Sequence, residues 1–165
     1  MSGQISPQQL TQQLQSDILA CETLLGLLEK EKTALSSRDI DAMDGIIEQK
    51  AEQLTSLEAS AQQRSQWSRD YLGQSGSDLE ALKQAWADML TSTGTPQLVE
   101  QWQKLKDLQI ACKQANEVNG KILARNQKTF GRLLEIVRGQ TAAPNLYSAA
   151  GKSTSGHISQ KVGEA

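Results

Sequence analysis

The residues that could carry out chemistry are few and widely separated along the chain. The single histidine, His157, lies near the end, and the two cysteines, Cys21 and Cys112, are far apart. A metal site needs several such ligands at characteristic spacings, and a nucleophile elbow or phosphate loop needs a Gly-rich turn after a strand. The sequence contains neither pattern, and its carboxylates alternate with Lys and Arg as on a solvated helix surface. We therefore expect no catalytic residue, no metal ligand, no cofactor and no enzymatic activity.

Charge and hydropathy argue against two further classes of partner. The formal net charge is −2 and no basic face is evident, so we expect no nucleic acid partner. The first residues, MSGQISPQQL, lack the basic region and apolar run of a secretory signal. No apolar stretch approaches the ~20 residues that a membrane span requires. We expect a cytoplasmic protein without membrane insertion, in which Cys21 and Cys112 are buried free thiols rather than a disulfide.

Two long helices are predicted in the first half of the chain. Ser6-Pro7-Gln8-Gln9 combines a capping box with Pro at the first helical position, and the apolar period continues to about Leu35. Asp39 is a suitable N-cap for the second helix, which is expected to end at Gly73. Because the connection is short, the two helices should run antiparallel. The predicted apolar stripes are Leu10, Leu14, Ile18, Cys21, Leu25, Leu28 and Leu35 in the first helix, and Ile40, Met43, Ile47, Leu54, Leu57, Ala61 and Tyr71 in the second.

A short helix and a further long helix are predicted in the second half. Ser77 and Glu80 form a second capping-box pattern before a short helix, and Thr95-Pro96 opens a helix that ends near Arg138, before Gly139. The expected fold is all-α: a long antiparallel helical hairpin or coiled-coil-like bundle of three long helices and one short helix. Residues 1–138 would form the helical domain and residues 139–165, rich in Gly, Ser, Ala and Lys, a flexible tail.

The apolar face of the last helix widens between Val118 and Val137, over an arc of roughly 160°. A face of that width can contact two neighbours, one of them the chain's own hairpin and the other a partner. Asn116, Asn119 and Asn126 lie on or beside this face. A buried Asn in a helix seam commonly fixes the register of packing, and the alternative is that these amides bind a peptide.

Three other polar or aromatic residues stand out. Lys50 and Arg64 occupy seam positions of the second helix, where they either extend their charged heads into water or form salt bridges across helices. Tyr147, next to Leu146, is an isolated aromatic in the polar tail. It is either incidental or part of a short recognition element, which Pro144 and Gly151 would present in an extended conformation.

Several short motifs resemble the FlgN family of flagellar type III export chaperones, in order and over most of the chain. The second helix is similar at Glu48-Gln49-Lys50 with Leu54, Leu57 and Gln63-Arg64. The last helix is similar at Trp102-Gln103, Asn116-Glu117-Val118-Asn119-Gly120 and Arg125-Asn126-Gln127, and the tail at Pro144-Asn145-Leu146-Tyr147 and Gly151. The chain departs from the family pattern at Ser148, where a Gly often follows the Tyr, which leaves the turn after Tyr147 open.

The resemblance implies a cytoplasmic chaperone for the hook-associated proteins at the hook–filament junction. Such a chaperone binds the disordered C-terminal segment of its client, prevents premature assembly, and delivers the client to the cytoplasmic domain of the flagellar export gate protein. By position, Leu146 and Tyr147 would dock on the gate. The implied client-binding residues are Asn116, Asn119, Ile122, Leu123, Asn126, Phe130, Leu133, Leu134 and Val137.

An empty client face would be an exposed apolar surface. We therefore expect the client-free chain to cover it, by forming a homodimer or by folding back its own tail. The alternative function is a self-assembling structural coiled-coil module without a dedicated client.

Overall fold

The computed structural model describes residues 5–73, 78–93, 95–139, 146–147 and 153–154. The described residues form four helices and two very short strands: α1 (Pro7–Ser37), α2 (Ile40–Leu72), α3 (Leu79–Ser92), α4 (Pro96–Val137), β1 (Leu146–Tyr147) and β2 (Ser153–Thr154). The chain divides into two compact units, Met1–Leu123 and Ala124–Ala165. The all-α class predicted from the sequence is confirmed.

The helix ends follow the capping residues predicted from the sequence. Ser6 caps α1: its Oγ accepts from the backbone N–H of Gln9, and the side chain of Gln9 accepts from the N–H of Ser6, at 3.2 and 3.1 Å. Asp39 caps α2 by accepting from the N–H of Ala42 at 3.1 Å. Between these helices Arg38 adopts a left-handed conformation, with φ 57°, a position that usually favours Gly.

The start of α3 differs from the prediction. The N-cap is Asp78, whose carboxylate accepts from the N–H of Ala81 at 2.6 Å, and Ser77 lies outside the described residues. Asp and Ser are comparably good caps, so a shift of one residue costs little. α4 begins at Pro96 as predicted, and its last residue is Val137, two residues before Gly139 at φ 70°.

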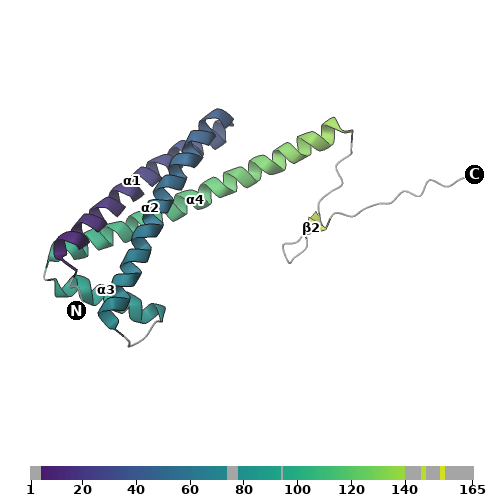
Figure 1. Cartoon of the computed structure of the whole chain (residues 1–165). Helices are drawn as coiled ribbons and strands as arrows, with labels where there is room; N and C mark the ends of the chain where they lie inside the picture. Colours follow the sequence, from purple (N-terminus) through teal and green to yellow (C-terminus); the bar gives the residue numbers. More distant parts are fainter. Residues whose placement is uncertain (1–4, 74–77, 94, 140–145, 148–152, 155–165) are drawn as a thin grey trace, which may run out of the picture. The chain divides into compact units, whose positions relative to one another are not determined.

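Within Met1–Leu123, α1 and α2 form an antiparallel hairpin, and α3 lies near the end that carries the start of α1 (Figure 1). The first part of α4 packs on α1 in parallel, because Cys112 contacts Cys21 and Asn119 contacts Leu28. The buried core joins α1, α3 and α4. Its members are Leu10, Leu14, Ile18, Cys21, Leu24, Leu28, Trp86, Met89, Leu90, Leu98, Leu105 and Cys112.

The helix α2 contributes less to this core than its sequence predicted. Its buried residues are Ile46, Arg64 and Ser68, while Leu57 and Trp67 pack against the core from its edge. Most of the apolar stripe predicted to face the hairpin is exposed instead, so that part of the prediction is wrong. The exposed members are Ile40, Ile47, Leu54, Ala61 and Tyr71.

The physical reason is that α2 meets α1 largely through polar side chains. Lys50, Leu57 and Arg64 recur every seven residues and face α1, and Lys50 and Arg64 bind acidic partners there. The row Ile40, Ile47 and Leu54 follows the same seven-residue period, three residues earlier along the helix, and is exposed. Periodicity identifies residues that share a face, but a partner decides which face is buried.

In the second unit, β1 and β2 form an antiparallel pair, with Leu146 opposite Thr154 and Tyr147 opposite Ser153. The remaining residues of the predicted flexible tail, 140–145, 148–152 and 155–165, lie outside the described residues.

Candidate functional site

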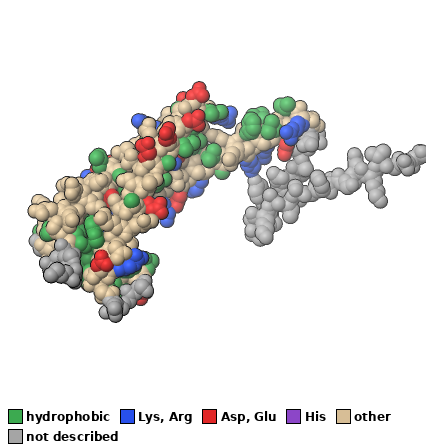
Figure 2. Space-filling view, viewed as in Figure 1, with side chains coloured by type: hydrophobic (Ala, Val, Ile, Leu, Met, Phe, Trp, Pro, Cys, Tyr) green, Lys and Arg blue, Asp and Glu red, His purple; other side chains and the backbone are tan. Residues whose placement is uncertain are grey.

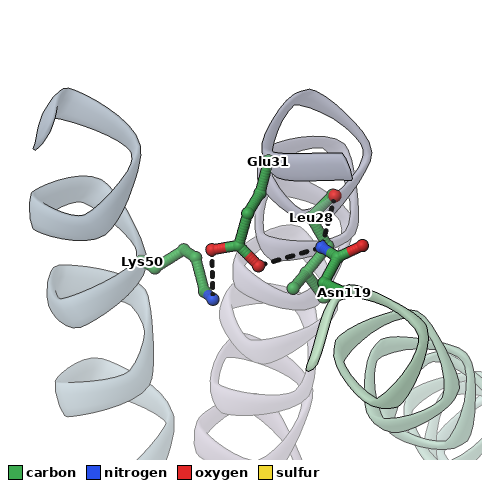
Figure 3. A network of polar contacts seen from close by, with 4 residues as sticks. All are labelled: Leu28, Glu31, Lys50 and Asn119. Atoms are coloured by element: carbon green, nitrogen blue, oxygen red, sulfur yellow. Dashed lines mark hydrogen bonds and ion pairs between the residues drawn. The ribbon is translucent and has the colours of Figure 1, made fainter. Parts of the chain in front are cut away.

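A buried polar cluster on the first part of α4 joins three helices (Figure 3). The amide nitrogen of Asn119 donates to the carbonyl oxygen of Leu28 at 2.8 Å and to Oε1 of Glu31 at 2.9 Å. Nζ of Lys50 donates to the other carboxylate oxygen of Glu31 at 2.8 Å. Both oxygens of this buried carboxylate are therefore partnered, one by α2 and one by α4.

This cluster fixes where α4 sits along α1. An amide that donates to one backbone carbonyl and one buried carboxylate would lose both bonds if α4 slid by a residue, at a cost of about 1–3 kcal/mol for each buried group left unpaired. Asn119 thus has the register-fixing position that the sequence offered as one of two readings. Of the other two amides, Asn116 is exposed and Asn126 is half-buried.

A second buried polar cluster lies further toward the start of α1. Arg64 of α2 forms an ion pair with Asp17 of α1, and its guanidinium lies over the ring of Trp102 of α4, 5.5 Å from the centroid. Trp102 in turn meets Trp86 of α3 edge to face, at 5.3 Å between centroids. The planar guanidinium can serve a carboxylate and an aromatic face at once, which an ammonium group does less well. Lys50 and Arg64 both form salt bridges across helices. Of the two alternatives predicted for them, exposure of their charged heads to water or a salt bridge, the structure therefore shows the second.

The two cysteines are part of the packing. Both are free and buried, and the thiol of Cys112 donates to the backbone carbonyl of Cys21 at 3.4 Å. Burial, together with the neighbouring Cys112 and Asp17, raises the pKa of Cys21 to about 11, and burial also raises the pKa of Cys112. Thiols with raised pKa values hold little thiolate near neutral pH, so both behave as small apolar side chains.

The outer part of α4 is different in kind from the part before it. From Gly120 to Gly139 no residue is buried, although the segment carries many large apolar side chains. Phe130 is 63% exposed and Val137 82% exposed, and Leu123, Leu133, Leu134 and Ile136 are exposed as well. Ile122 is half-buried. Figure 2 shows hydrophobic and basic side chains together on this part of α4.

The residues predicted to bind a client thus differ in their exposure, and Ile122 and Asn126 are half-buried. Asn119 is buried in the chain's own packing, whereas Leu123, Phe130, Leu133, Leu134 and Val137 lie on the surface of α4.

The predicted gate-docking pair, Leu146 and Tyr147, forms β1, and the placement of its side chains lies outside what is described. The exposed row Ile40, Ile47 and Leu54 on α2 was missed as a candidate surface. Its seven-residue spacing was visible in the sequence, but its exposure was not.

Two further features are absent from the described residues. No group of three or more His, Cys, Asp or Glu side chains is placed to hold a metal ion among them. No helix in this part of the chain is long and apolar enough to cross a membrane.

An all-helical bundle whose longest helix ends in an exposed apolar face is typical of helical proteins that bind other proteins. The chain matches the family described as FlgN protein over residues 1–155, and it belongs to that family. The FlgN family consists of flagellar export chaperones, which bind flagellar proteins and are not known as enzymes. No curated protein and no solved structure matches the chain significantly.

Proposed function

We propose that this protein is a cytoplasmic chaperone that binds the disordered C-terminal segment of hook-associated proteins and delivers them to the flagellar export gate. The observation that carries the proposal is the exposed apolar face of outer α4, formed by Leu123, Phe130, Leu133, Leu134 and Val137. Membership of the FlgN family supports the general role of a flagellar export chaperone. The specific clients and the gate step are inferred from the resemblance of the tail and the last helix to that family.

The physical basis is recognition of one amphipathic helix by another. A client segment that is disordered alone would fold as a helix and bury its apolar stripe against outer α4. Ordering the segment consumes part of the interaction free energy, which keeps the affinity moderate and allows release. Gly131 is half-buried beside Phe130 and has no other side chain within 4 Å of the position that a Cβ would occupy. The side of α4 at Gly131 is therefore open.

The experiment is a binding titration with a peptide from the C-terminal segment of a hook-associated protein. Leu123→Asp with Phe130→Asp should abolish binding, because two carboxylates would be buried without partners in the complex. The matched control is Leu19→Asp, which places the same charge at an exposed apolar position of α1. Circular dichroism of all variants checks that helix content is retained. Undiminished peptide binding by the double variant would refute this face as the client site.

Docking on the export gate is proposed for Leu146 and Tyr147 of β1. Tyr147→Ala should reduce export of the client in cells while leaving the peptide titration unchanged. Phe in place of Tyr147 separates the contributions of the ring and the hydroxyl. A loss of peptide binding in Tyr147→Ala would instead assign the tyrosine to the client site.

The alternative, a structural coiled-coil module without a client, predicts an assembly that a client peptide leaves intact. The family match favours the chaperone. Exposed apolar rows on two helices are nonetheless a reason to examine self-association, which a chaperone can also use.

A further inference from the structure

The last part of α4 carries its apolar and its basic side chains on different sides. Its large apolar residues between Ala124 and Val137 are all exposed: Phe130, Leu133, Leu134, Ile136 and Val137. At about 100° per residue they lie within an arc of roughly 160° of the helix surface. Arg125, Lys128 and Arg132 lie within about 60° of one another on the remaining side. The segment is therefore an amphipathic helix with a basic polar side (Figure 2).

This segment is more basic than the chain as a whole. Residues 124–138 contain four basic residues and one carboxylate, a net charge of +3, whereas the whole chain carries −2. All five of these charged side chains are exposed. Arg125, Arg132 and Arg138 form no ion pair with another described residue. Their charges are therefore available to an anionic partner outside the chain.

The placement of apolar and basic side chains on opposite sides decides which kind of partner fits both. A groove on another protein contacts one side of a helix, so it would bury the apolar side and leave the basic side in water. An anionic lipid surface serves both sides, because a helix lying in it has acyl chains beneath it and head groups around it. A helix with its side chains is about 10 Å across, which is close to the Debye length at physiological ionic strength. Basic side chains on the upper side are therefore still attracted by the anionic lipids.

We propose that residues 124–138 of the client-free chain bind the surface of an anionic lipid bilayer. Phe130, Ile136 and Val137 face the acyl chains, and Arg125 and Arg132 lie among the anionic head groups. Such a helix lies along the membrane and does not cross it. Burial of its apolar side in lipid also stabilises the helical state of a segment that is only marginally helical by itself.

Membrane binding has a consequence that rests on the proposed function. The apolar side that the lipid would cover is the side proposed for the client. Client and anionic lipid would then compete, so the empty chaperone would be held at the membrane surface and the loaded one released from it.

The test is flotation of the full chain with lipid vesicles, without client. Vesicles of phosphatidylcholine with about one third phosphatidylglycerol should bind the chain at least about tenfold more tightly than vesicles of phosphatidylcholine alone. High salt should weaken binding to the anionic vesicles, because it screens the basic side chains.

Two pairs of substitutions examine the two sides of the helix. Arg125→Glu with Arg132→Glu should weaken binding to anionic vesicles at least about tenfold. The matched control is Lys32→Glu with Lys113→Glu, which gives the same net charge at exposed positions of α1 and of the first part of α4 and should have little effect. On the apolar side, Phe130→Gln with Ile136→Gln keeps every charge and should also weaken binding about tenfold. Its control is Leu19→Gln with Ile110→Gln, at apolar positions that are exposed elsewhere.

Measurements with the client peptide separate this inference from the proposed function. Arg125→Glu with Arg132→Glu should leave the peptide titration unchanged, because the client is expected on the apolar side. Failure of the client proposal would not affect the flotation results, because no client is present in them.

Amide hydrogen exchange of the unchanged chain locates the contact without any substitution. Anionic vesicles should slow exchange in Ala124–Val137 more than in Leu98–Asn119. A bound chain whose exchange stays fast in Ala124–Val137 would overturn the inference.

Other results would also overturn it. A chain that does not float with anionic vesicles leaves the apolar side to a protein partner. Equal losses in the two pairs of charge substitutions would show attraction by net charge rather than by this helix. Undiminished binding of Phe130→Gln with Ile136→Gln would show that the apolar side does not enter the lipid.

Discussion

At the scale of single residues, the buried polar side chains hold the helices in one arrangement. Glu31 accepts from Asn119 of α4 and from Lys50 of α2, and Asp17 is paired with Arg64, which also stacks on Trp102. Hydrophobic side chains of similar size would pack with little directional preference, whereas these bonds exist in only one register. The sequence marked Lys50, Arg64 and Asn119 as unusual because they interrupt apolar stripes. Their partners Asp17 and Glu31 gave no such signal, since an acidic residue on a helix is ordinarily on the surface.

Removal of the Asn119 amide should show how much its hydrogen bonds to Leu28 and Glu31 contribute to the free energy of unfolding. Asn119→Ala leaves one oxygen of Glu31 without its donor in a buried position, and we expect a loss of about 1–3 kcal/mol in the free energy of unfolding. Asn116→Ala, on the exposed side of the same helix, should change it by less than about 0.5 kcal/mol. Urea unfolding followed by circular dichroism gives both values. Equal losses in the two variants would show that the bonds to Leu28 and Glu31 contribute nothing measurable.

The buried thiol of Cys21 predicts a pH dependence in the alkaline range. Its pKa is raised from 9.0 to about 11 in the folded chain, so the unfolded chain releases this proton first as the pH rises. Below about pH 9 this thiol leaves the free energy of unfolding unchanged, because it is protonated in both states. Between about pH 9 and pH 11 the free energy of unfolding falls, because the unfolded chain ionises first. The loss should be on the order of 2 kcal/mol. Urea midpoints at pH 8 to 11 should fall less steeply in Cys21→Ala than in the unchanged chain, and parallel curves would contradict the assignment.

At the scale of elements, caps and breaks could be predicted well and helix faces only in part. Ser6, Asp39, Pro96 and Gly139 act locally, so their effects are readable from a few neighbouring residues. The orientation of α2 depends on which of two adjacent heptad rows meets α1. Ion pairs with Asp17 and Glu31 decide that choice, and the sequence alone does not reveal contacts between residues so distant along the chain.

The connection between α1 and α2 contains a position, Arg38, where a substitution should increase the stability of the fold. Arg38 is left-handed at φ 57°, where an L side chain costs about 1 kcal/mol relative to Gly. Arg38→Gly should therefore raise the free energy of unfolding by about 0.5–1 kcal/mol, after the greater freedom of Gly in the unfolded chain is counted. Arg69→Gly, inside α2, is the matched control and should be destabilising by a similar amount. A lower urea midpoint for Arg38→Gly would mean that the arginine side chain stabilises the turn in a way that outweighs its backbone conformation.

At the scale of the whole molecule, α4 differs in burial along its length. The first part of α4 supplies Leu98, Leu105, Cys112 and Asn119 to the buried interior, and the part after Asn119 supplies no buried residue. An isolated helix of about 18 residues is only marginally stable in water. We therefore expect a bound partner to stabilise the part of α4 after Asn119.

Amide hydrogen exchange can test this division directly. In dilute, client-free chain, the amides of Ala124–Val137 should exchange faster than those of Leu98–Asn119, because local opening of the outer helix breaks no buried contact. Binding of the client peptide should slow exchange in outer α4. Slow exchange throughout α4 in the dilute, client-free chain would show that the outer helix needs no partner to be stable. Protection of α2 by the client peptide alone would move the client site to the hairpin.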